Sequence, residues 1–355
     1  MRSQTAGAVL AFAMTGVAAC SKSDSSGDLS RGGPQTPDAT SDGGSSGNAP
    51  DGSGPKADAA PAPPPTPSGC ITDVTPGDHT FMCEGFSTDV SIPSACVQPG
   101  CGLITEIHGD TGTGALMDAN TNLKALGKQR GYVVVAPTGP PWPGGPGSTW
   151  SVSNDETVIK IIKKVAEVFR TDPKKNHVTG FSRGGFVAWR LLCKHADLFA
   201  SVAPGTAGSS PGGACNGVSE VSCPFDATQP GGMPSTEVPI LFLMGRTDTP
   251  VPLACTQRVR DQAIAAWNLT TKSTVDGDAQ YTHTRWANAK GTVLETYEHS
   301  YETATPGPWA SAKGHCFPGS TMDPQAPQYA VPCKLPNAFT WGAEVMKFFE
   351  AHPQK

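Results

Sequence analysis

The chain has 355 residues, a formal net charge of −5 and eleven cysteines. The charge is mild and lysine and arginine form no cluster, so a nucleic-acid partner is not expected. The sequence shows no internal repeat.

The first twenty residues, MRSQTAGAVLAFAMTGVAAC, have the pattern of a secretory signal peptide. Arg2 precedes an apolar stretch that ends in small residues and is too short to span a membrane. The end, VAAC, resembles the lipobox of bacterial lipoproteins, in which the cysteine becomes the lipidated first residue. We therefore expect lipidation at Cys20 and a protein anchored to the outer membrane or cell surface, where Ser21 favours the outer membrane. The alternative is a plain signal and a secreted protein.

Residues 21–69 are predicted to be a disordered Gly/Ser/Pro/Ala linker. They contain no aromatic residue, and Leu29 is their only large aliphatic residue. Such a segment buries too little apolar surface to offset the entropy of ordering it. Residues 70–355 have a suitable length for one large domain.

Ten cysteines remain once Cys20 is set aside, and an even number in an exported chain suggests disulfides. None of them has the spacing of a zinc site, so no metal is expected. Close spacing favours four pairs, and it leaves a fifth as a long-range pair or two buried thiols: Cys70–Cys83, Cys96–Cys101, Cys215–Cys223, Cys316–Cys333 and, last, Cys193–Cys255.

Strand and helix patterns alternate from residue 101 onward. Apolar and β-branched runs predict strands, and 3.6-residue periodicity predicts helices. The predicted strands are 103–109, 132–137, 177–181, 198–204, 238–245 and two within 282–299, and the predicted helices are 116–130, 155–171, 184–196, 253–267 and 339–352. Asn154 is placed to cap the second helix. Residues 70–100 are expected to form a small antiparallel edge of the same sheet. The alternation predicts an α/β fold with a mainly parallel central sheet and helices on both faces.

The stretch HVTGFSRGGFVAWR carries the candidate nucleophile, Ser182. It reads as a strand, a sharp glycine turn and a helix, which is the context that makes G-x-S-x-G informative. Gly180 and Gly184 relieve the crowding of that turn. The alternative, a glycine-rich turn without chemistry, is less consistent with this context.

A serine nucleophile needs a base and a carboxylate that orients the base. Asp248 follows the end of a predicted strand, where functional groups of such sheets gather. His315 lies in a loop, KGHCFPG, before the final helix, and it is preferred over His299, which ends a predicted strand. His283 and His352 are weaker candidates because they fall in a strand pattern and near the terminus.

The oxyanion hole is expected to use the backbone N–H groups of Arg183 and Asp110. The first follows the serine, and the second lies in the loop HGDTGTG after an early strand. A carboxylate beside a forming oxyanion would oppose it, so we predict that the side chain of Asp110 turns away and pairs with Arg183.

The motifs IHGDTGTG, RGYVVVAPTG, HVTGFSRGG, PILFLMGRTDTPVP and GHCFPG together resemble exported esterases of the polyhydroxybutyrate depolymerase, feruloyl esterase and acetylxylan esterase group. The resemblance implies an α/β-hydrolase fold, Ser182 as nucleophile, Asp248 as acid and His315 as base. The histidine loop departs from the group's usual G-G-H-x-W-P-G, because Phe317 replaces the tryptophan. That change leaves the substrate open.

The loop 138–150 is expected to border the acyl site. Trp142 and Trp150 in this loop, together with Phe317, are the predicted substrate-binding residues, with an ordinary packing role as the alternative for the two tryptophans. The expected function is hydrolysis of a small, polyester or polysaccharide-linked carboxylic ester through an acyl-enzyme, with no cofactor. A serine peptidase and a non-catalytic surface-binding lipoprotein are the alternatives.

Overall fold

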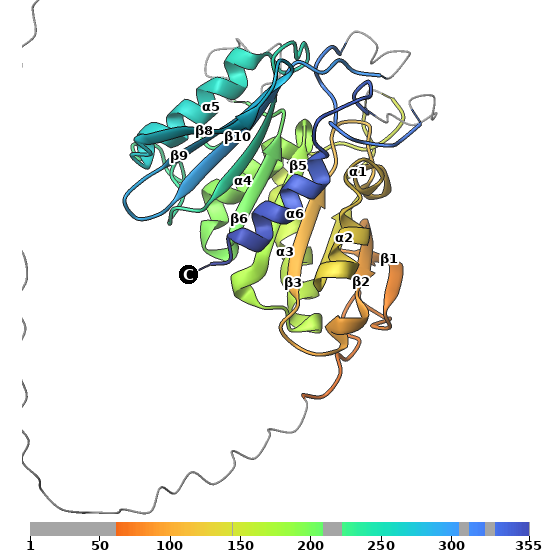
Figure 1. The fold of residues 1–355 in the computed structure, drawn as a ribbon. Coiled ribbons are helices and arrows are strands. Elements are labelled where there is room, and N and C mark those ends of the chain that lie inside the picture. The colour runs from red at the N-terminus through yellow and green to blue at the C-terminus, as the bar shows by residue number, and fades with distance from the viewer. Residues whose placement is uncertain (1–61, 144, 209–221, 305–311, 324–330, 355) are drawn as a thin grey trace, which may run out of the picture. The chain divides into compact units, whose positions relative to one another are not determined.

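The computed structural model describes residues 62–143, 145–208, 222–304, 312–323 and 331–354 (Figure 1). The predicted signal peptide, Cys20 and most of the predicted linker lie outside the described residues. The end of that linker, 62–69, packs on the domain: Pro65 is buried, and the guanidinium of Arg170 donates to the Pro63 carbonyl.

A ten-stranded sheet in the order β1-β2-β4-β3-β5-β6-β7-β10-β9-β8 forms the centre of the domain. Its middle strands, from β4 to β10 in that order, run parallel, and both edges are antiparallel. The strands are β1 Gly77–Cys83, β2 Phe86–Ile92, β3 Gly102–Ile107, β4 Tyr132–Pro137, β5 Asn176–Phe181, β6 Ser201–Gly205, β7 Ile240–Gly245, β8 Thr271–Gly277, β9 Tyr281–Ala287 and β10 Val293–His299. This is the α/β-hydrolase fold that the sequence predicts.

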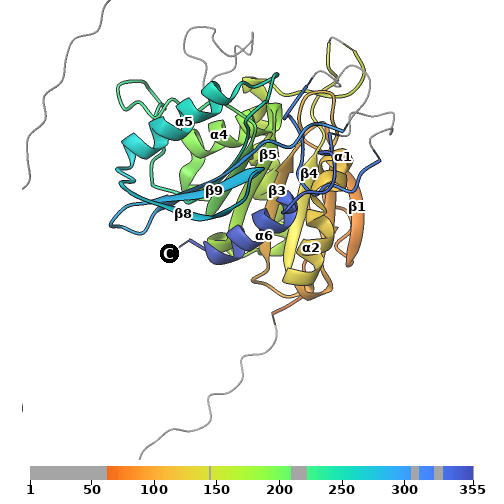
Figure 2. The same ribbon diagram turned by 45° about the horizontal axis from the view of Figure 1, so that its top comes forward.

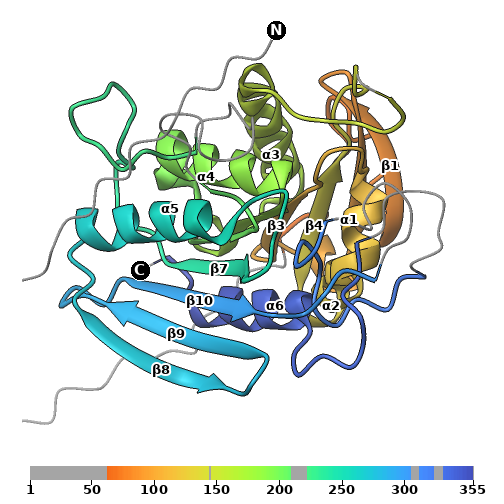
Figure 3. The ribbon, with the colours of Figure 1, turned by 90° about the horizontal axis from the view of Figure 1, so that it is seen from above.

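Helices cover both faces of the sheet (Figure 3). One face carries α1 Gly114–Thr121, α2 Leu123–Arg130 and α6 Trp341–Ala351, with α6 lying beside α1 and α2 (Figure 2). The other face carries α3 Asp155–Phe169, α4 Arg183–His195 and α5 Leu253–Ala266. None of the helices in these described stretches is long and apolar enough to cross a membrane.

The sheet is buried on both sides by two apolar clusters. Every residue of β4 and β5 is buried, as their continuous apolar runs predict. The cluster under α3, α4 and α5 also contains one buried ion pair. Arg190 Nη2 lies 2.8 Å from Asp155 Oδ1 and its Nε lies 2.9 Å from Oδ2, so a bidentate pair links α4 to the start of α3.

The local structure differs from the prediction at three places. The helix expected at 116–130 is two helices, because Asn122 adopts a left-handed conformation with φ of 59°, which asparagine tolerates better than most residues. Asn154 makes no side-chain cap on α3 and instead accepts a hydrogen bond from the Ser151 N–H. Strand β8 was not predicted, since all its side chains are exposed and it has no apolar alternation.

Disulfides join four pairs of described cysteines: Cys70–Cys83, Cys96–Cys101, Cys193–Cys223 and Cys316–Cys333. Three of them match the predicted pairs. The predicted Cys215–Cys223 and Cys193–Cys255 are wrong, because the fold brings Cys223 against α4, where it bonds to Cys193. Cys255 is also disulfide-bonded, and Cys215 lies outside the described residues. Sequence spacing therefore predicted the wrong partner for Cys193, because the fold brings it against a cysteine 30 residues away.

Candidate active site

Ser182 occupies a sharp turn between β5 and α4. Its backbone has φ of 53° and ψ of −121°, a region that non-glycine residues rarely adopt. The turn is possible because its flanks are glycines: a Cβ at Gly180 would lie 2.2 Å from the Gly184 oxygen, and one at Gly184 would lie 2.0 Å from the Ile107 oxygen. The turn places the serine at the N-terminus of α4, where the helix dipole favours negative charge.

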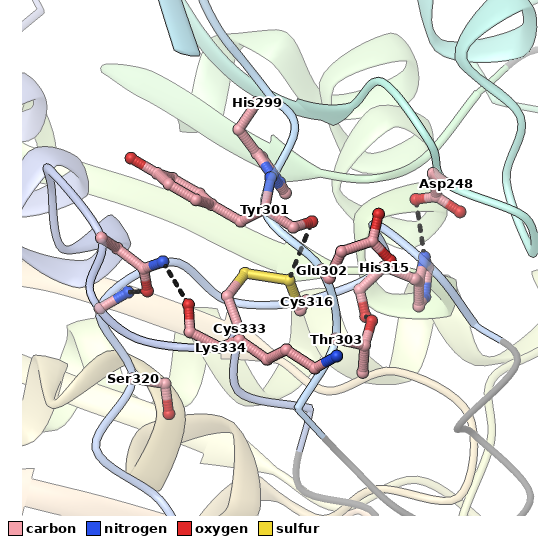
Figure 4. Close-up of a disulfide and its surroundings, with 12 residues drawn as sticks. Asp248, His299, Tyr301, Glu302, Thr303, His315, Cys316, Ser320, Cys333 and Lys334 are labelled. Carbon is pink, nitrogen blue, oxygen red and sulfur yellow. Dashed lines mark hydrogen bonds and ion pairs between the residues drawn. A yellow bond between two sulfur atoms is a disulfide. The ribbon is translucent and has the colours of Figure 1, made fainter. Parts of the chain in front are cut away.

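Asp248 and His315 form a buried hydrogen-bonded pair (Figure 4). His315 Nδ1 donates to Asp248 Oδ2 at 2.8 Å, and Asp248 Oδ1 accepts the Val251 N–H at 2.8 Å. The side chain of Asp248 is 0% exposed and that of His315 is 3% exposed. Because both carboxylate oxygens are engaged, the orientation of the imidazole is fixed, with Nδ1 protonated and Nε2 available as an acceptor.

The loop of His315 approaches the Asp248 turn closely because it contains Gly314. This glycine has φ of +68°, and a Cβ on it would lie 2.6 Å from the Asp248 nitrogen. The Thr249 N–H also donates to the Lys313 oxygen at 3.1 Å. The glycine before His315 is therefore required by its left-handed backbone and by its close approach to Asp248.

The other histidine candidates have different partners. His299 is fully buried at the end of β10, and its Nδ1 accepts the Tyr301 N–H at 3.2 Å. Burial, with smaller contributions from Arg246 and His315, lowers the pKa of His299 to about 3. His283 bonds to Glu295 at 2.9 Å. Neither is paired with Asp248.

The loop after β3 lies directly against the serine. A Cβ at Gly109 would lie 3.2 Å from Ser182 Cβ and 3.8 Å from its Oγ, so glycine keeps the space beside the hydroxyl open. The predicted ion pair is present: Arg183 Nε lies 3.1 and 3.2 Å from the two oxygens of Asp110. The Thr149 hydroxyl also donates to this carboxylate.

His108, one residue earlier, fixes the shape of this loop. Its Nδ1 donates to the Gly109 oxygen at 2.6 Å, and its Nε2 accepts the Gly139 N–H at 3.0 Å. Burial lowers its pKa to about 4, so the ring is neutral at pH 7 and keeps this tautomer. Sequence reasoning missed His108, because a histidine before a glycine does not reveal which backbone groups it will bind.

The loop 138–150 supports the same segment, and this gives Trp150 its role. The indole of Trp150 is 1% exposed, and its Nε1 donates to the His108 oxygen at 3.0 Å. The Thr111 N–H donates to the Ser148 oxygen at 2.7 Å. Trp150 is therefore a packing residue beneath the loop after β3, and its prediction as a substrate-binding residue is wrong.

One pocket contains Ser182 and His315, and its cavity volume is about 40 Å³. Phe317 lines it, and the Phe317 ring stacks on Phe181 with centroids 4.0 Å apart. Trp142 is half-buried and is not among the lining residues. The walls that sequence reasoning missed are Leu116, Met117, Asn120 and Val331. Three of them lie on α1 at the i, i+1, i+4 spacing of one helix face. That spacing was the sequence signal that could have identified them as a group sharing one face.

Comparison with known proteins gives partial matches, and no family model matches the chain. A stretch of 127 residues is 28% identical to the bifunctional acetylxylan esterase/xylanase of Neocallimastix patriciarum, covering 34% of this chain and 18% of that protein. A stretch of 111 residues is 28% identical to acetylxylan esterase A of Aspergillus ficuum, covering 28% of this chain and 35% of that one. The chain resembles acetylxylan esterases.

The chain thus spans between about a fifth and a third of the length of these curated relatives. Among solved structures, the acetyl xylan esterase from Aspergillus awamori matches with a TM-score of 0.46 at 15% identity, covering 60% of this chain and 87% of that one. The resemblance to esterases that the sequence motifs predict is confirmed by the curated sequences.

Proposed function

We propose that this protein is a serine esterase that hydrolyses short-chain carboxylic esters, acetyl esters first among them. The observation that carries the proposal is one pocket containing a serine on a strained turn and a histidine whose far nitrogen donates to a buried carboxylate. A nucleophile, a base and a group that orients the base are the three parts that acyl transfer requires.

In this mechanism Ser182 Oγ attacks the ester carbonyl while His315 Nε2 takes the hydroxyl proton. Asp248 holds the ring in the tautomer that leaves Nε2 able to accept, and it stabilises the imidazolium that forms. His315 then gives the proton to the leaving alcohol, and the acyl group remains on Ser182. Water, activated by the same nitrogen, releases the acid and restores the serine.

The oxyanion of each tetrahedral intermediate would be stabilised by the backbone N–H groups of Arg183 and Asp110. Arg183 is the first residue of α4 and directly follows Ser182, so its backbone lies at the helix N-terminus, where the helix dipole favours negative charge. Backbone donors aimed at the developing charge contribute about 3 kcal/mol each to lowering the barrier. The ion pair with Arg183 directs the Asp110 carboxylate onto a cation, which supports the placement of its backbone in the hole.

The size of the acyl pocket favours acetyl. A water molecule needs roughly 10–15 Å³ of cavity volume measured this way, and the volume beside Ser182 is only about 40 Å³. An acetyl group has three heavy atoms, whereas hydroxybutyryl and feruloyl groups are larger. The curated relatives are acetylxylan esterases by name, and an acetylated polysaccharide is the substrate we propose.

The test is hydrolysis of p-nitrophenyl acetate and butyrate by the purified protein, with Ser182→Ala as the matched control. We expect the acetate to be preferred by about tenfold or more, in line with the cost of extra methylenes in a hydrophobic pocket. A panel of acetylated xylan, methyl ferulate and hydroxybutyrate oligomer then assigns the natural class. Equal rates for the parent protein and Ser182→Ala would refute the proposal.

We further propose that the protein is exported and anchored through a lipid on Cys20. Its disulfides are typical of an oxidising compartment. Incorporation of an alkyne fatty acid into the expressed protein, compared with Cys20→Ser, tests the anchor. Equal labelling of the two proteins would contradict it.

A further inference from the structure

The Cys316–Cys333 disulfide joins two segments that carry three residues of the pocket. Cys316 lies between His315 and Phe317 in sequence, and Val331 lies two residues before Cys333. All three of these neighbours line the pocket. The disulfide is therefore within two residues in sequence of the proposed base, His315, and of the pocket residues Phe317 and Val331.

These two segments have little regular structure of their own. In the described stretches 312–323 and 331–334 the backbone forms only isolated bridges. The Phe317 N–H donates to the Val331 oxygen at 2.8 Å, and the Cys333 N–H donates to the Phe317 oxygen at 3.1 Å. The disulfide joins the same two segments covalently, and it is stronger than either of these hydrogen bonds.

The disulfide is buried beside His299 and Tyr301 (Figure 4). Cys316 is 0% exposed and Cys333 is 1% exposed. Cys316 Sγ lies 3.8 Å from the Tyr301 oxygen, and one nitrogen of His299 lies within 4.8 Å of both sulfurs. The sulfurs therefore pack against the segment His299–Tyr301.

From the disulfide, contacts lead directly to the reacting groups. Phe317 stacks on Phe181 at 4.0 Å, and Phe181 lies 4.9 Å from the ring of His315. The Thr303 hydroxyl donates to the oxygens of Ala312 and His315, which ties the base's loop to the chain segment that follows β10. A change at Cys316 would move the pocket wall and the base together.

We propose that the Cys316–Cys333 disulfide is a positioning element that keeps the acyl pocket narrow, and so sets the preference for the shortest acyl chains. The inference rests on the proposed esterase function. Without the crosslink, Phe317 and Val331 can separate, so the pocket admits longer chains while the base is less well placed for all of them.

The test is the double variant Cys316→Ala with Cys333→Ala, assayed on p-nitrophenyl acetate, butyrate and hexanoate. We expect kcat for acetate to fall by about tenfold to a hundredfold, the cost of a misplacement near 1 Å. We expect the acetate-to-butyrate ratio of kcat/KM to fall by about tenfold, chiefly through a lower KM for butyrate. A second version, Cys316→Ala with Cys333→Val, restores buried volume and covers the case in which the first does not fold.

The matched control is Cys70→Ala with Cys83→Ala. This disulfide has a sequence separation of 13, against 17 for Cys316–Cys333, so removing either should lower thermal stability by a similar amount. The control should keep the parent's acyl selectivity. An unchanged ratio in folded Cys316 and Cys333 variants, or the same change in the control, overturns the proposal. Either result leaves the esterase assignment standing, whereas an inactive parent protein removes the assignment itself.

Discussion

Replacing Asp248 by asparagine should disable the base while leaving the fold intact. Asp248 Oδ1 accepts the fixed backbone N–H of Val251, so the amide oxygen of the variant must stay at that position. The amide NH₂ then faces His315 Nδ1, which lies 2.8 Å from the oxygen it replaces. Two donors cannot share that contact, so the proton of His315 moves to Nε2, and the nitrogen that should accept from Ser182 becomes a donor.

The expected loss is about 10⁴-fold in kcat, the size seen when a triad histidine is held in the wrong tautomer. That factor corresponds to about 5 kcal/mol of barrier. The kcat of Asp248→Asn should fall by the same factor on p-nitrophenyl acetate and on p-nitrophenyl butyrate. The thermal midpoint should change little because aspartate and asparagine are isosteric.

The control is Asp261→Asn, an identical chemical change at a carboxylate that is 61% exposed on α5. It should retain full activity. A loss of less than tenfold in folded Asp248→Asn would refute this account, since it would mean that another group orients the histidine.

Three further predictions follow from other contacts. Asp110→Asn should change kcat/KM by less than about threefold, because its side chain faces Arg183 rather than the proposed oxyanion; a large gain on p-nitrophenyl acetate would place the carboxylate's charge in the site. Asp155→Ala should lower the free energy of unfolding in urea by about 3–5 kcal/mol, because it leaves Arg190 buried without its bidentate partner; a change below about 1 kcal/mol contradicts this. Burial lowers the pKa of His177 to about 3 against about 6.5 unfolded, so unfolding takes up a proton in that window and stability falls as pH drops from 6.5 towards 3. His177→Phe should flatten the pH dependence of unfolding between pH 4 and 6 by up to about 1.4 kcal/mol per pH unit, and parallel curves for variant and parent would refute this.

The parts of the fold that depend on local pattern could be predicted from sequence. The buried strands β4 and β5 are continuous apolar runs, and α3 has one apolar face, so their side chains identify them without tertiary information. Strand β8 could not be predicted, because its exposed residues are ordered only by pairing with β9. The same holds for Asn122, where one residue's left-handed backbone divides a helix.

For the candidate site, chain order and strand ends were sufficient to propose Ser182, Asp248 and His315. Contacts between distant loops were not predictable in the same way. Trp150 has the composition of a stacking residue, and only the fold shows that its indole bonds to the His108 carbonyl. Cys193 likewise has no sequence signal for Cys223, since helix α4 determines which cysteine faces it.

The support that the loop 138–150 gives to the segment after β3 has a consequence for protein engineering. The conformation of His108–Thr111 is specified by partners about thirty to forty positions later in the chain, among them Gly139 and Trp150. Grafting HGDTG alone onto another scaffold would transfer the sequence without the residues of the loop 138–150 that hold its backbone in this conformation. The two loops are one transferable unit, and directed changes of selectivity should treat them as a single cassette.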